Sequence, residues 1–174
     1  MNAAGDLAWG PAADRPDLLA DPVAAAIAGV PSARVAEIDP GLADTAAFCE
    51  AYGSAPESSA NCVVVAGRRG GETRRAAVLV LATDRADVNG TVRRHIDARK
   101  ISFAPMEEAV DLTGMEYGGI TPVGLPADWP VLVDDAVVAA GEVVIGSGLR
   151  RSKLLVDAAE LAALASVEVL ALSL

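Results

Sequence analysis

The chain has 174 residues, of which 52% are hydrophobic and 3% aromatic, and it carries a formal net charge of −10. This size and apolar content exclude a wholly disordered chain, because enough surface can be buried to build a core. The net acidity argues against a protein that coats DNA, and two residues each of Phe, Tyr and Trp offer little surface for stacking bases.

Metal ligands and targeting segments are both scarce. The only cysteines are Cys49 and Cys62 and the only histidine is His95, which is too few for a structural zinc site or a disulfide framework. The start of the chain lacks a basic segment followed by a long apolar run, and no apolar run approaches the roughly 20 residues that cross a bilayer. We therefore expect a cytoplasmic protein with no metal, no cofactor and no membrane segment.

The charge is unevenly distributed along the chain. Residues 60–100 hold nine of the 14 basic residues and have a local net charge of +5, whereas residues 1–59 have −7 and residues 101–149 have −8. We call residues 60–100 the basic segment; it includes Arg74, Arg75, Arg93 and Arg94. Such a face can bind a polyanion, but the charge pattern alone favours a solvated surface with internal ion pairs.

In chain order, residues 1–30 predict an N-terminal extension with one helix. The stretch up to Pro16 is rich in Gly, Pro and Asp, and the following residues favour a helix over Leu18–Ala28 that ends at Gly29. The folded domain is then expected over residues 31–174. It is predicted to begin with a strand over Arg34–Ile38, a turn at Asp39–Gly41, and a helix over Leu42–Tyr52 with Gly53 just beyond its end.

A β-hairpin and a series of short elements are predicted next. The β-rich runs Cys62–Gly67 and Arg75–Thr83 are joined through Gly70-Gly71, a pair typical of a tight turn. We then expect helices over Val88–Ala98 and Pro105–Leu112, strands over Ile101–Phe103, Val131–Val133, Val143–Ile145, Leu154–Val156 and Val167–Leu172, and a helix opened by a capping box from Asp157 to Glu160. This alternation predicts one mixed α/β domain around a single sheet.

Candidate nucleophiles favour structural roles. Gly146-Ser147-Gly148 superficially suggests a nucleophile elbow, but a second strand is predicted after it and no histidine is placed to act as base. Cys62 opens a β-run and Cys49 lies inside a predicted helix, so both are expected to be small core residues. His95, beside Arg93 and Arg94, is expected to belong to the basic face.

The loop from Gly118 to Pro126, with the sequence GGITPVGLP, is the most unusual stretch. Adjacent glycines let the backbone approach a ligand closely, and prolines stiffen the loop. Unpaired backbone N–H groups there could bind a developing oxyanion, although a rigid connection between a helix and a strand is an open alternative.

Several segments together resemble the YbaK/prolyl-tRNA-synthetase-associated editing domain family. The resemblance runs from about Arg34 to the C-terminus, and its most specific part combines Leu112-Thr113-Gly114 with the Gly118–Pro126 loop. The supporting segments, in matching order and spacing, are Asn61–Gly67, Lys100–Ala104 and Val133-Asp134-Asp135. The family fold that this implies is of the α/β (α+β) class, with a mixed, largely antiparallel sheet flanked by helices.

The resemblance also implies an activity, the trans-acting hydrolysis of the ester between tRNA and a wrongly attached small amino acid. The backbone of Gly118 and Gly119 would hold the carbonyl, next to Asn61, and the acceptor end of the tRNA would contact Arg74, Arg75, Arg93 and Arg94. The pocket that selects small side chains would be formed by Cys62, Ile120, Thr121, Gly146, Ser147 and Lys153.

One departure from the family bears directly on the chemistry. Active members carry a lysine where Asn61 stands, and an asparagine can hydrogen-bond a carbonyl but cannot supply a cation. Lys153 occupies a polar position of the family pattern and could supply that cation from another strand; a surface lysine is the alternative. The sequence therefore favours a trans-acting deacylase, with a catalytically silent aminoacyl-tRNA-binding module as the alternative and a hydrolase of other small acyl esters as a third interpretation.

Overall fold

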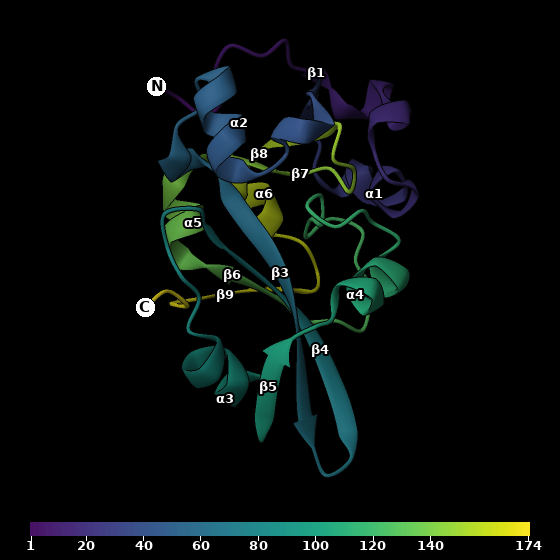
Figure 1. Cartoon of the computed structure of the whole chain (residues 1–174), viewed down its shortest axis with the longest axis vertical. Helices are drawn as coiled ribbons and strands as arrows, with labels where there is room; N and C mark the ends of the chain where they lie inside the picture. The colour runs from purple at the N-terminus through teal and green to yellow at the C-terminus, as the bar shows by residue number, and fades with distance from the viewer.

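The computed structural model describes residues 1–174, whose strands form two sheets (Figure 1). The first sheet is antiparallel and has the order β1 (Gly10–Pro11), β2 (Arg34–Glu37), β8 (Ser152–Asp157) and β7 (Glu142–Gly146). The second has the order β5 (Lys100–Phe103), β3 (Ala60–Arg69), β4 (Glu72–Leu81), β6 (Val131–Asp134) and β9 (Val167–Leu170). In this sheet β5, β3 and β4 pair antiparallel, whereas β4–β6 and β6–β9 are parallel.

The mixed, largely antiparallel α/β class is thus confirmed, but the single sheet was wrong. The helix α5 (Asp135–Ala140), which was not predicted, follows β6 directly and redirects the chain. After this helix, β7 and β8 pair with each other across a short turn. Because β2 pairs with the other edge of β8, these strands form a separate sheet. The apolar run of α5 is too short for its period to distinguish helix from loop.

The hairpin of β3 and β4 is the longest feature of the fold and was correctly predicted. Its register pairs Ala60 with Leu81 at one end and Arg69 with Glu72 at the other. Gly70 and Gly71 have φ values of 59° and 82°, as a two-residue hairpin turn requires. Figure 1 shows the turn end of the hairpin projecting below the rest of the molecule, with β5 along one side.

Two predicted helices differ from the expectation. The N-terminal one is broken into a 3₁₀ turn over Pro16–Leu18, α1 (Asp21–Ala26) and a second 3₁₀ turn over Ile27–Gly29. The one expected over Val88–Ala98 consists of a π-helical turn over Val88–Val92 followed by α3 (Arg93–His95). There the carboxylate of Asp87 accepts hydrogen bonds from the N–H groups of Gly90 and Thr91, and the N–H of Val92 reaches back to the carbonyl of Asp87, which widens the turn.

The remaining helices are α2 (Thr45–Tyr52), α4 (Met106–Thr113) and α6 (Ala158–Ala162), with short 3₁₀ turns over Ala12–Asp14, Pro40–Leu42 and Pro56–Ser58. Gly53 and Gly114 end α2 and α4 with φ values of 65° and 67°, as predicted. Asp157 caps α6 through the N–H of Ala159, but Glu160 bonds to Ser32 instead of completing a capping box. None of the helices combines the length and the apolar character that a membrane crossing requires.

The main core lies between the two sheets. Val35 and Leu154 of the first sheet pack in one buried cluster with Leu79 and Val131 of the second. The N-terminal residues enter the same cluster through Leu18, Val23 and Val30. This packing holds the start of β3 close to β7 and β8, and the candidate site lies at that junction.

Candidate functional site

A cavity of about 420 Å³ opens at the start of β3, between the start of α2, the end of β5 and the loop that follows α4. Six of the residues expected at a site from the sequence line it together: Asn61, Cys62, Gly118, Ile120, Gly146 and Lys153. The size is within the usual range for a small-molecule pocket. Because its walls come from both sheets, the cavity depends on their relative packing.

Lys153 brings a cation to this cavity from the first sheet. It lies on β8 opposite Ala36 and Gly146, and only 8% of its surface is exposed. Its Nζ donates a hydrogen bond of 2.8 Å to the carbonyl oxygen of Ala43 and lies 5.5 Å from the centre of the Phe48 ring. Burial lowers the pKa of Lys153 from its ordinary value, and the nearby carboxylate of Asp44 partly offsets this effect.

Asn61 meets the cavity from the second sheet. Its Oδ1 accepts a hydrogen bond of 2.7 Å from the hydroxyl of Thr45, the first residue of α2. This bond orients the side-chain amide and leaves the two N–H donors of Nδ2 without a partner in the protein. The neutral amide of Asn61 and the buried ammonium of Lys153 therefore line the same cavity.

Cys62 is partly exposed and lines the cavity. Burial raises the pKa of its thiol to about 12, so the side chain is a protonated thiol near neutral pH. Cys49 is buried in α2, with its Sγ 3.6 Å from the hydroxyl of Ser59. Cys49 thus has the core position that the sequence predicted, whereas Cys62 packs at the edge of the main core and also lines the cavity.

The loop after α4 reaches the cavity through close backbone packing. A Cβ atom on Gly146 would lie 2.4 Å from the carbonyl oxygen of Gly119, and one on Gly119 would lie 2.8 Å from the backbone of Leu149. Gly118 has a φ of 88° and lines the cavity. Glycine is therefore required on both sides of this contact, because any side chain would separate the loop from β7.

Three residues expected at the site lie outside the cavity lining. The N–H of Gly119 donates to the carbonyl of Glu116, and its own carbonyl accepts from the N–H of Gly148, so both of its backbone polar groups have partners. Ser147 is fully buried, and its hydroxyl lies 2.6 Å from that of Ser152 within the turn between β7 and β8. Thr121 is fully buried as well, and its hydroxyl has no hydrogen-bond partner.

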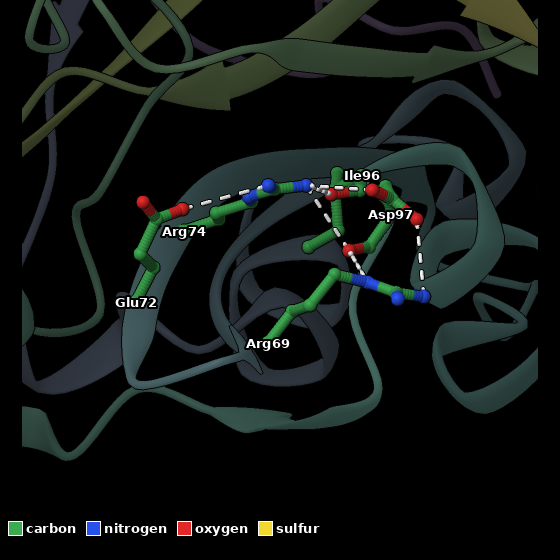
Figure 2. A network of polar contacts seen from close by, with 5 residues as sticks. All are labelled: Arg69, Glu72, Arg74, Ile96 and Asp97. Carbon is green, nitrogen blue, oxygen red and sulfur yellow. Dashed lines mark hydrogen bonds and ion pairs between the residues drawn. The ribbon is translucent and has the colours of Figure 1, made fainter.

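The four arginines assigned to tRNA separate into two pairs. Arg74 forms ion pairs with Glu72 and Asp97, and Figure 2 shows Arg69 reaching the same Asp97 from the neighbouring strand. Arg75 pairs with Glu108 of α4. Arg93 and Arg94, on α3, form no ion pair, although Nε of Arg93 donates to the carbonyl of Asn89.

His95, expected on the basic face, instead contacts an acidic residue of another strand. Its Nε2 lies 2.5 Å from a carboxylate oxygen of Glu168 on β9. The charged surface predicted from the sequence is thus partly neutralised by contacts between distant segments, which no local pattern indicates.

The segment at the start of α2 contributes to the site in a way that was not predicted from the sequence. Ala43, Asp44 and Thr45 all line the cavity; Ala43 accepts the hydrogen bond of Lys153, and Thr45 donates to Asn61. The predicted helix started at Leu42, three residues before the first residue of α2. Asp44 and Thr45 were therefore placed inside the helix, whereas they form its N-terminal end. An Asp-Thr pair before a helical run is a usual helix start and could have moved that boundary.

Comparisons with known proteins identify related sequences and folds. The sequence profile of the aminoacyl-tRNA editing domain family matches residues 39–164. A proline–tRNA ligase of Lactobacillus gasseri is 36% identical over 73 residues, which are 40% of this chain and 13% of the ligase. The matched part is therefore a small portion of that much longer enzyme.

Solved structures share the fold over most of the chain. A candidate trans-editing enzyme for prolyl-tRNA synthetase superposes with a TM-score of 0.76 at 25% identity, covering 89% of this chain and 96% of that one. A scaffold protein used for epitope grafting has the same TM-score at 24% identity, covering 89% and 97% of the two chains, which shows the fold alone.

Proposed function

We propose that the chain, which belongs to the aminoacyl-tRNA editing domain family, hydrolyses in trans the ester between a tRNA and a small, wrongly attached amino acid. The observation that carries the proposal is the buried ammonium of Lys153 in the wall of the cavity that also holds Asn61 and Gly118. An ester needs no strong nucleophile if its carbonyl is held and polarised.

In this mechanism Lys153 takes over the role of the cation that Asn61 cannot supply. Its ammonium has three N–H donors, and the carbonyl of Ala43 uses one, so two remain for a ligand. Water adds to the ester carbonyl carbon, and the negative charge that develops on its oxygen is stabilised by Lys153. The C–O bond then breaks, the proton passes to the ribose oxygen, and the free amino acid and the tRNA leave.

Backbone and amide groups complete the same site. The N–H of Gly118 has no partner in the protein, unlike that of Gly119, so of the two glycines it is the one available to the carbonyl. The Nδ2 group of Asn61 can donate to the attacking water or to the ester. The apolar residues Val64, Ala109 and Ile120 restrict the space for a side chain, which favours small amino acids.

The basic segment, residues 60–100, would contact the acceptor end of the tRNA. From Asn61 to Arg68, β3 rises by roughly 23 Å at about 3.3 Å per residue, so the basic turn end of the hairpin lies well away from the cavity. Arg93 and Arg94 form no ion pair, although the charge of Arg94 is one of the causes that lower the pKa of the nearby Asp87. An extended polyanion whose acylated end occupies the cavity could reach them.

The test is a deacylation panel with tRNAs carrying alanine, serine or cysteine, several tRNA species, and correctly charged tRNAs as controls. We expect hydrolysis of at least one mischarged tRNA above the spontaneous rate, and no hydrolysis of prolyl-tRNA. Absence of turnover on every member, with binding of an uncleavable analogue retained, would overturn the proposal in favour of a silent binding module. That second candidate is favoured by the single observation that Asn61 replaces the family lysine, and gain of activity in Asn61→Lys would support it.

A further inference from the structure

The edge of β3 that faces the cavity is only partly covered. On this side β5 pairs with β3 from Val65 to Arg68, and the N–H of Ala104 adds one more bond, of 2.9 Å, to the carbonyl of Val64. Before Val64 no strand is paired with this edge until the single bridge between Ser59 and Val144. The uncovered stretch is the part of β3 that lines the cavity.

The alternation of a strand determines which backbone groups this open edge presents. The carbonyls of Val64 and Arg68 accept bonds on the β5 side, whereas the carbonyl of Ser59 accepts the N–H of Ala82 on the β4 side. In an antiparallel strand the N–H and C=O of one residue point to the same side, and successive residues alternate. Cys62, two residues before Val64, therefore presents both its N–H and its C=O to the cavity.

The N–H and C=O of Cys62 are arranged to pair with the amino and carbonyl groups of an α-amino acid unit. Two residues that form a hydrogen-bonded antiparallel pair exchange both N–H···O=C bonds. An aminoacyl ester has the same arrangement as a strand residue, with an amino group and a carbonyl on either side of one Cα atom. It can therefore pair with Cys62 as a strand of a single residue.

We propose that the backbone of Cys62 recognises the α-amino and carbonyl groups of an L-aminoacyl ester by β-pairing. The α-ammonium group donates to the carbonyl of Cys62, and the ester carbonyl accepts from the N–H of Cys62. This inference rests on the proposed function, and it restricts the substrate to α-aminoacyl esters instead of small acyl esters in general. It also explains why the thiol need not react, since only the backbone of Cys62 takes part.

The pairing is tested on the ligand, with uncleavable amide analogues of 3′-acylated adenosine that carry L-alanyl, D-alanyl or propionyl groups. The propionyl analogue lacks only the α-amino group, so it loses a hydrogen bond made by a charged donor. We expect its Kd to be about tenfold higher or more than that of the L-alanyl analogue. The D-alanyl analogue should also bind more weakly, because its methyl group points in the direction that the Cα hydrogen has in the L-alanyl analogue.

Amide hydrogen exchange supplies a second readout that does not depend on a mutation. Binding of the L-alanyl analogue should slow exchange of the Cys62 amide, while the Val63 amide, which points to β4, should not change. Cys62→Ala keeps both backbone groups and should keep the ratio of the two Kd values. Equal Kd values for L-alanyl and propionyl analogues, or an unchanged Cys62 amide, would overturn the pairing.

The two proposals fail in different ways. If the unmodified protein hydrolyses mischarged tRNA but binds the propionyl analogue as tightly as the L-alanyl one, only the pairing is wrong. If it hydrolyses none of the mischarged tRNAs while the Cys62 amide still becomes protected by the L-alanyl analogue, the pairing stands and the chain is a binding module.

Discussion

The ammonium of Lys153 donates a hydrogen bond to the carbonyl of Ala43, two residues before the first residue of α2. This contact links β8 of the first sheet to the start of α2, and both line the cavity. The bond fixes a long flexible side chain that would otherwise lose several rotamers on ligand binding. The cation and the amide of Asn61 thus come from two different sheets, and the helix start between them holds both.

Replacement of Lys153 by methionine should remove the charge while preserving most of the side-chain volume. We expect deacylation to fall by about 10²-fold, as when one group that stabilises an oxyanion is lost. The matched control is Lys100→Met, because Lys100 is the only other lysine and lies exposed on β5, outside the cavity. Single-turnover kinetics measure the effect, and circular dichroism checks the fold. An unchanged rate in Lys153→Met would exclude Lys153 from catalysis.

The lowered pKa of Lys153 also predicts how stability depends on pH. The folded state binds this proton less tightly than the unfolded state, so the buried charge costs stability below the folded pKa. That cost disappears as the pH rises from the folded pKa to the ordinary value of 10.5. The free energy of unfolding of the unmodified protein should therefore rise relative to Lys153→Met over this range, as measured by urea titrations. A constant difference between the two proteins would contradict the shift.

The strand order and the cavity differ in how far the sequence could predict them. The Gly70-Gly71 turn and the ends of α2 and α4 were predictable, because each depends on a few neighbouring residues. The two-sheet arrangement was not, since it depends on α5, whose six residues carry no distinctive period. Local patterns determine local structure, whereas sheet membership is decided by packing between distant segments.

The same distinction applies to the candidate site. Gly118 was identified from its glycine- and proline-rich loop, and Asn61 and Lys153 through the family resemblance; the cavity brings the three together. The expected contributions of Gly119 and Ser147 depended on which way their polar groups face, and in the structure both face inward, to other backbone or side-chain groups. The open backbone edge at Cys62 could not be predicted, because it results from β5 being shorter than β3.

Close packing between β7 and the loop after α4 makes Gly146→Ala a sensitive change. Its new methyl group would lie 2.4 Å from the carbonyl oxygen of Gly119, which must then move. We expect a loss of about 1–3 kcal/mol in the free energy of unfolding, as for other overpacked sites. Gly10→Ala is the control, because no atom lies within 4 Å of the corresponding position. Equal stability of the two variants in urea titrations would show that the loop is free to shift.

The two pairs of arginines should differ in their contribution to RNA binding. Arg74 and Arg75 are engaged with carboxylates, so binding a phosphate would first require those ion pairs to break. Arg93 and Arg94 form no direct ion pair that would have to break, and each phosphate they contact releases counterions. The double variant Arg93→Ala/Arg94→Ala should therefore weaken binding of an acceptor-stem RNA and reduce the slope of log K against log[salt] by about 1.4 to 1.8.

The matched double variant Arg74→Ala/Arg75→Ala removes the same formal charge from the same segment. We expect it to change the salt slope much less, because Glu72, Asp97 and Glu108 already neutralise most of that charge locally. Fluorescence anisotropy at several KCl concentrations measures both slopes. If the two double variants reduce the slope equally, net charge alone attracts the RNA, and the ion pairs do not determine which arginines it contacts.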